Sequence, residues 1–139
     1  MRLFFMFSDK LTVNNSSETS LRVFCTLSRR IIYSMLGESA GKAILFFLQE
    51  ALRRDPFEVL WENPKAFYDE MSRIFGEGTK VLINILLTNI DRECGLSMNP
   101  EHFIEIVQSS DQGSLEEIRS FIRDVAKRCG GIKHEYDGC

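Results

Sequence analysis

The sequence has few of the features that identify a function directly. Its four cysteines, Cys25, Cys94, Cys129 and Cys139, stand far apart. Because they form no CxxC pair, they exclude a zinc ribbon and a thioredoxin-type redox site. A chain of this length builds its own hydrophobic core and has little need of a disulfide scaffold. We therefore expect a cytoplasmic protein with reduced thiols, in which Cys25 and Cys94 are buried packing residues.

Long apolar runs are missing too. The longest, Ala43 to Leu48, is far below the roughly 18 residues that span a bilayer, and Leu3 to Phe7 is too short for a secretory signal. Seventeen Lys and Arg against twenty Asp and Glu give a net charge of −3, which disfavours nucleic acid as a partner. A Walker loop, a dinucleotide-binding GxGxxG and an HExxH motif are also absent. We predict no cofactor, no metal and no membrane association.

What the sequence does contain is helical spacing. From Ser28 onward, apolar residues recur every three or four positions, in a chain that is 44% hydrophobic and 27% charged. Three Asx-Pro pairs predict helix starts and two glycines predict helix ends. They are Asp55-Pro56, Asn63-Pro64, Asn99-Pro100, Gly76 and Gly95. A capping box at residues 114–117 predicts the start of the last helix. The predicted fold is all-α, a single-domain bundle of five or six helices over residues 28–131.

The two ends of the chain are predicted to differ from this bundle. Residues 1–27 contain a polar Asn/Ser/Thr cluster, and Val23, Cys25 and Leu27 alternate with other residues as in a strand. This segment is predicted to be an irregular or short-stranded arm, either disordered or packed on the body. Residues 132–139 are predicted to form a flexible tail.

A GxSxG motif at Gly37–Gly41 matches the nucleophile elbow of serine hydrolases, in which a strand turns sharply into a helix. That interpretation makes Ser39 the nucleophile and either His102 or His134 the base. The alternative is that the small residues permit a bend or a close contact between helices. Because the segments after Ser39 have helical spacing, we favour the alternative and predict no enzymatic activity.

The C-terminal residues offer a candidate metal site. Cys129, His134 and Cys139 have the C-x4-H-x4-C spacing of side chains that zinc accepts. Zinc needs four ligands held in a tetrahedron, and a flexible terminus offers little preorganisation. A zinc site in this tail is therefore an alternative that the spacing leaves open.

A DNA-binding regulator is a further alternative, because the helices on either side of Gly76–Gly78 have helix-turn-helix proportions. The polar residues that the second helix, residues 79–94, offers to base edges are Lys80, Asn84, Asn89 and Arg92. They stand among leucines and isoleucines, which indicates a core helix first. The basic pairs Arg29-Arg30 and Arg53-Arg54 are typical of solvated charges at helix ends.

The central residues have features of a known family. The shared stretches are Leu36-Gly37-Glu38-Ser39, the aromatics Phe46 and Phe47, Pro64-Lys65-Ala66-Phe67, Ile74-Phe75-Gly76-Glu77-Gly78, Lys80-Val81-Leu82 and Gly95-Leu96. On these stretches residues 29–96, about half of the chain, resemble the small archaeal Nitrosopumilus output-domain family. The resemblance implies a non-enzymatic helical module that acts in signal output, and it offers no catalytic residues.

These observations predict a protein-interaction or signal-output module. Two helical stretches, 44–48 and 83–87, are apolar on more than half of their circumference, and such helices must be buried on most sides. The candidate interaction residues are Phe46, Phe47, Ile83 and Leu87, with Phe46 or Leu87 as the anchor. The predicted partner is another protein or a second copy in a homodimer. An equal alternative is that Leu3 to Phe7 folds back as a cover.

Overall fold

The computed structural model describes residues 2–130 of the chain, with side chains from residue 18 onward. Within that range it has seven helices and no strand. They are α1 (Arg2–Leu36), α2 (Glu38–Leu52), α3 (Pro56–Glu62), α4 (Pro64–Phe75), α5 (Gly78–Cys94), α6 (Pro100–Gln108) and α7 (Gln112–Cys129). The all-α class is confirmed, with at least one helix more than the sequence predicted, since Gly37 separates α1 from α2.

The predicted Asx-Pro starts are confirmed, because each Asx side chain accepts a backbone hydrogen bond at the helix start. The acceptors and donors are Asp55 with the Phe57 N–H at 2.9 Å, Asn63 with the Ala66 N–H at 3.2 Å, and Asn99 with the Glu101 N–H at 2.8 Å. Gly76 and Gly95 end α4 and α5 as predicted, with φ angles of 56° and 68°.

The last helix begins earlier than its capping box predicted. Asp111 Oδ1 accepts a hydrogen bond from the Ser114 backbone N–H at 2.8 Å, so Asp111 is the N-cap and α7 begins at Gln112. Asp and Ser are about equally favourable at an N-cap. The first of two suitable residues takes the position, and Ser114 lies inside the first turn.

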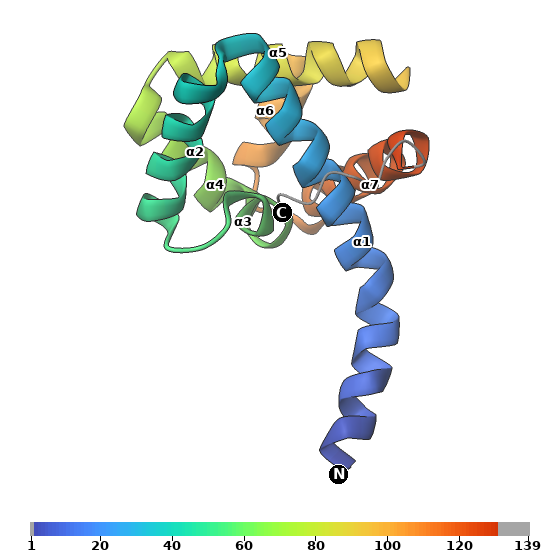
Figure 1. The fold of residues 1–139 in the computed structure, drawn as a ribbon. Coiled ribbons are helices and arrows are strands. Elements are labelled where there is room, and N and C mark those ends of the chain that lie inside the picture. The colour runs from blue at the N-terminus through green and yellow to red at the C-terminus, as the bar shows by residue number, and fades with distance from the viewer. Residues whose placement is uncertain (1, 131–139) are drawn as a thin grey trace.

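The prediction of a stranded arm over residues 1–27 is wrong, because α1 is one helix from Arg2 to Leu36. Phe24, Leu27 and Ile31 are buried, and their spacing of three and four makes a helical stripe that crosses the predicted boundary at residue 28. The N-terminal half of α1 projects away from the body (Figure 1), so its backbone does not fold back as a cover. The predicted tail 132–139 lies outside the described residues.

The core is centred on α7, whose apolar face packs against α1, α5 and α6. Val107, Ile118, Ile122 and Val125 are completely buried there. α5 lies among α1, α4, α6 and α7, whereas α2 packs on α1, α3 and α4. In Figure 1, α1 runs between α2 and α7. α2 is therefore a peripheral helix, with one side on the body and the other free for contacts.

Candidate functional site

The glycines of the GxSxG motif shape the junction between α1 and α2. Gly37 has a φ of +94°, a conformation that residues with side chains rarely adopt. A Cβ atom on Gly41 would lie 2.6 Å from Cδ1 of Tyr33, so a side chain there would require the Tyr33 ring or α2 to shift. The predicted close helix contact is confirmed. Ser39 is exposed in the first turn of α2.

The outward side of α2 is the candidate interaction surface. The buried residues of this helix are Gly41, Leu45 and Leu48. Its exposed apolar residues, which we call the α2 outer face, are Ala40, Ala43, Phe46 and Phe47. Phe46 and Phe47 are 57% and 53% exposed, and their ring centroids lie 5.8 Å apart in an edge-to-face arrangement. The two rings form an aromatic patch on solvent-facing surface.

Charged side chains border the α2 outer face. Lys42 Nζ lies 2.8 Å from Glu38 Oε2, and this hydrogen bond raises the pKa of Lys42 and lowers the pKa of Glu38. Glu50 is exposed and follows Phe46 and Phe47 at the three- and four-residue spacing of one helix side. The face thus has an apolar centre, the Glu38–Lys42 ion pair toward its N-terminal end and a carboxylate at its C-terminal end.

Ile83 and Leu87 do not join this face, so the sequence prediction is corrected for these two residues. They are 4% and 3% exposed, because they lie on the side of α5 that packs against other helices, among them α1, α4, α6 and α7. Both line an apolar cavity of about 50 Å³ in the core. Leu87 cannot anchor a partner, and the predicted surface is reduced to Phe46 and Phe47.

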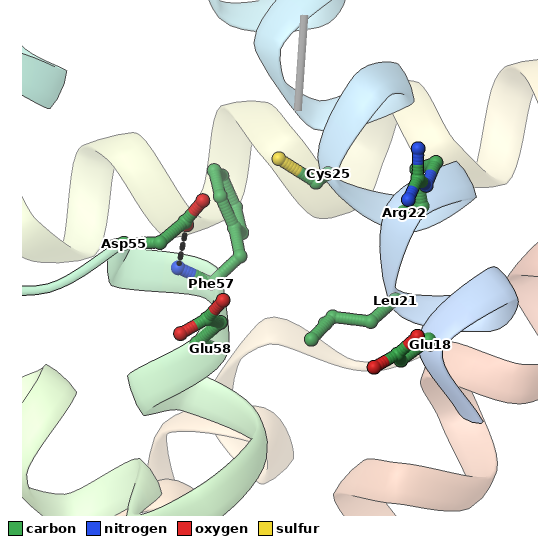
Figure 2. A pocket seen from close by; sticks show the side chains of 7 residues that line it. All are labelled: Glu18, Leu21, Arg22, Cys25, Asp55, Phe57 and Glu58. Atoms are coloured by element: carbon green, nitrogen blue, oxygen red, sulfur yellow. Dashed lines mark hydrogen bonds between the residues drawn. The ribbon is translucent and has the colours of Figure 1, made fainter. Parts of the chain in front are cut away.

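A cleft of about 210 Å³ lies between α1 and the start of α3 (Figure 2). Its lining residues are Glu18, Leu21, Arg22, Cys25, Asp55, Phe57 and Glu58. Asp55 Oδ1 accepts a hydrogen bond from the Phe57 backbone N–H at 2.9 Å, so this carboxylate caps α3. The lining residues include no histidine that could act as a general base.

His102, the one histidine among the described residues, links α6 to α7. Its Nε2 lies 2.6 Å from Glu117 Oε2 and its Nδ1 lies 3.8 Å from Glu105 Oε1. The hydrogen bond with Glu117 raises the pKa of His102.

The serine of the GxSxG motif, Ser39, follows a helix, whereas the serine of a nucleophile elbow follows a strand. The other predicted base, His134, lies outside the described residues.

Cys94 and Cys129 form a disulfide, and Cys25 is disulfide-bonded too, so the prediction of reduced thiols is wrong for these three residues. The Cα atoms of Cys94 and Cys129 lie 5.7 Å apart and their bond joins the last residues of α5 and α7. Arg128 Nη1 adds hydrogen bonds to the carbonyl oxygens of Cys94 and Gly95, at 3.5 and 3.2 Å. Spacing along the chain could not reveal this pair, because it depends on where two helices end in space.

The disulfide also removes Cys129 from the candidate zinc ligands. His134 and Cys139, the other two candidates, lie outside the described residues. Among the side chains that the structure describes, residues 18–130, no three His, Cys, Asp or Glu are grouped closely enough to hold a metal ion.

The polar residues of α5 are used partly within the helix itself. Asn89 is buried, and its Nδ2 donates a hydrogen bond to the Ile85 carbonyl oxygen at 2.8 Å. Arg92 Nη1 donates to Asn89 Oδ1 at 3.0 Å. Two of the four candidate base-reading side chains are therefore bonded to each other, while Lys80 and Asn84 are exposed.

The two arginine pairs are also engaged with their own chain. Arg30 Nη2 lies 2.6 Å from Glu93 Oε1, which ties α1 to the end of α5. Arg54 Nη2 lies 2.9 Å from Glu62 Oε1, within the α2–α3 region. These contacts neutralise one member of each pair.

None of the described helices combines the length and the apolar character needed to cross a membrane. Comparison of the chain with protein-family models, with curated proteins and with solved structures gives no match.

Proposed function

We propose that this chain is a helical protein-interaction module whose contact surface is the α2 outer face. The observation that carries the proposal is the pair Phe46 and Phe47, each more than half exposed on a helix whose other side is already packed. Burying a fully exposed phenylalanine gains roughly 1.5–3 kcal/mol, and large aromatic side chains carry much of the energy of interfaces. Two adjacent aromatic rings on the outside of a monomer are expected of a docking surface.

The resemblance to the output-domain family supports a role in signal output. That resemblance includes Phe46 and Phe47, which lie on the exposed side of α2. The Gly76-Glu77-Gly78 stretch of the resemblance connects α4 to α5 and so contributes to the fold. The module then acts by binding a protein, with no chemical step of its own.

Photo-crosslinking tests this proposal. Benzoylphenylalanine replaces Ala40, at the edge of the α2 outer face, and in a matched control it replaces Ser120, which is exposed on α7. The purified chains are irradiated alone and in extract of the source cells. We expect a crosslink to a protein from position 40 and none from position 120. If position 40 gives no crosslink in either setting, while circular dichroism shows an intact fold, the proposal is wrong.

The compartment is a separate prediction. The sequence predicts a cytoplasmic protein, but the Cys94–Cys129 bridge argues for an oxidising environment, because disulfides persist mainly there. Alkylation of thiols in intact source cells, followed by mass spectrometry, decides between them. Alkylated Cys94 and Cys129 would support the cytoplasm, and unmodified, linked cysteines would contradict it.

A further inference from the structure

We infer that the apolar cavity in the core is a binding site for a small uncharged molecule without hydrogen-bonding groups, such as a short alkane. The cavity has a volume of about 50 Å³ and is lined by side chains of α1 to α6. The inference goes beyond the proposed function, because the cavity involves the packed side of α2 and not the α2 outer face.

The lining of the cavity selects an apolar occupant. Every lining side chain is apolar, and the most deeply buried of them, Phe24, Leu48, Leu60 and Leu87, are at most 3% exposed. The lining residues all lie within helices, where backbone N–H and C=O groups bond to one another. A buried water molecule needs about two to four polar partners, so this space does not hold water.

The cavity is larger than the gaps that close packing normally leaves. Few voids in protein interiors exceed one water molecule, which occupies about 30 Å³ in the liquid. A void of about 50 Å³ leaves its lining atoms without contacts on one side. An apolar molecule restores these contacts and displaces no hydrogen-bonded group. Apolar cavities of about 150 Å³ bind benzene, so the occupant here is smaller than benzene.

The cavity lies where α2 and α5 face each other across the core. α2 packs on α1, α3 and α4, whereas α5 packs on α1, α4, α6 and α7. Both helices nevertheless line the cavity, α2 with Leu45 and Leu48 and α5 with Ile83 and Leu87. An occupant therefore bridges two helices that are held in place by other neighbours.

Partly exposed side chains form the entrance to the cavity. Ile44 of α2 and Leu82 and Leu86 of α5 line it and are also accessible to solvent. Exposed side chains change rotamer within picoseconds to nanoseconds. A small molecule can therefore pass between these three side chains while the helices stay folded.

Methyl NMR of the full chain tests the inference. Alkanes from ethane to n-pentane are added in turn to protein labelled at its Ile, Leu and Val methyl groups. The methyl groups of Leu48, Ile83 and Leu87 should shift saturably. Those of Ile118 and Val125, buried in α7, which does not line the cavity, should not. The inference is overturned if no alkane gives saturable shifts at the lining methyl groups, or if Ile118 and Val125 shift equally.

The dependence on alkane length distinguishes a cavity of fixed size from general partitioning onto apolar surface. Each added CH₂ should tighten binding by about fourfold as long as the alkane fits. The next CH₂ should weaken binding, because a closely packed interior does not expand without strain. An affinity that rises steadily up to n-pentane, with no maximum, would contradict the inference.

Variants of one α2 residue locate the site. Leu48→Phe fills the cavity and should abolish the alkane-dependent shifts at Ile83 and Leu87. The matched control is Leu52→Phe, the same substitution one turn further along α2 at a residue that does not line the cavity, and it should bind as the wild type does. Equal loss of binding in the two variants would overturn the inference.

If Leu48→Phe does not fold, Leu48→Ala takes its place. This variant enlarges the cavity, so the alkane that binds most tightly should be a longer one than in the wild type. A folded Leu48→Ala with an unchanged preference for alkane length would overturn the inference. Neither result depends on a partner at the α2 outer face, so this inference and the proposed function are tested separately.

Discussion

Replacing Cys94 and Cys129 together with alanine removes the covalent link between the last turns of α5 and α7. The bond closes a loop with a sequence separation of 35 residues. For a loop of that length, the lost conformational entropy of the unfolded chain corresponds to about 3.8 kcal/mol at 25 °C. A domain is typically stable by only about 5–15 kcal/mol, so this single bond supplies a large part of the free energy of unfolding.

Urea denaturation followed by circular dichroism measures this loss. With a slope of about 2 kcal/mol per molar urea, the double variant should unfold at roughly 2 M less urea than the wild type. Each single replacement should cost nearly as much as the double one, because the cross-link requires both sulfurs. The hydrogen bonds from Arg128 to the Cys94 and Gly95 carbonyls use backbone acceptors, so they can form in all three variants.

The reasoning is refuted if the double variant unfolds within about 1 kcal/mol of the wild type, far less than the loop entropy requires. Additive losses in the two single variants would also refute it, because they would mean that each cysteine contributes by packing alone. Alkylation of the unreduced wild-type protein gives an independent control. Cys94 and Cys129 should stay unmodified even in denaturant.

The remaining predictions concern one ion pair and two glycines. Glu117 raises the pKa of His102, so the ion pair of these two residues stabilises the folded chain. This stabilisation is complete below the pKa of a histidine in the unfolded chain, about 6.5, and is lost as the pH rises through the higher pKa of His102 in the folded chain. Urea midpoints should therefore fall across this range more steeply in the wild type than in His102→Gln, and parallel curves would contradict this. Gly41→Ala should lower stability by about 1 kcal/mol despite its better helix propensity, because the new Cβ meets Tyr33 Cδ1 at 2.6 Å. Gly113→Ala, whose Cβ would have no contact closer than 3.9 Å, should raise stability by up to about 1 kcal/mol, so thermal unfolding should give opposite signs.

Helix boundaries were the most predictable part of this fold, because a helix cap is a hydrogen bond between residues only two or three positions apart in the sequence. An Asx side chain before a proline can bond only to the N–H groups just ahead of it, and Asp55, Asn63 and Asn99 all do so. The same locality explains the error at α7. Asp111 and Ser114 both satisfy the rule, and sequence alone does not rank two suitable caps.

The contacts that join distant segments could not be predicted in the same way. The alternation of Val23, Cys25 and Leu27 suggested a strand, yet Phe24, Cys25, Leu27 and Ser28 are all buried, at the one-, three- and four-residue spacing of one side of a helix. The disulfide and the pair of His102 with Glu117 likewise depend on which helix ends meet. No spacing rule applies to them, since the intervening chain folds back before the two groups approach.

The candidate site shows where local pattern stops being informative. The sequence contains two stretches that are apolar on more than half of their circumference, one in α2 and one in α5. α5 packs against four helices, which buries Ile83 and Leu87, whereas α2 lies at the periphery with Phe46 and Phe47 exposed. The excess of apolar surface was visible in the pattern, but its location depends on the packing of the other five helices. The apolar surface that α2 leaves exposed is the surface on which the proposed function places a partner.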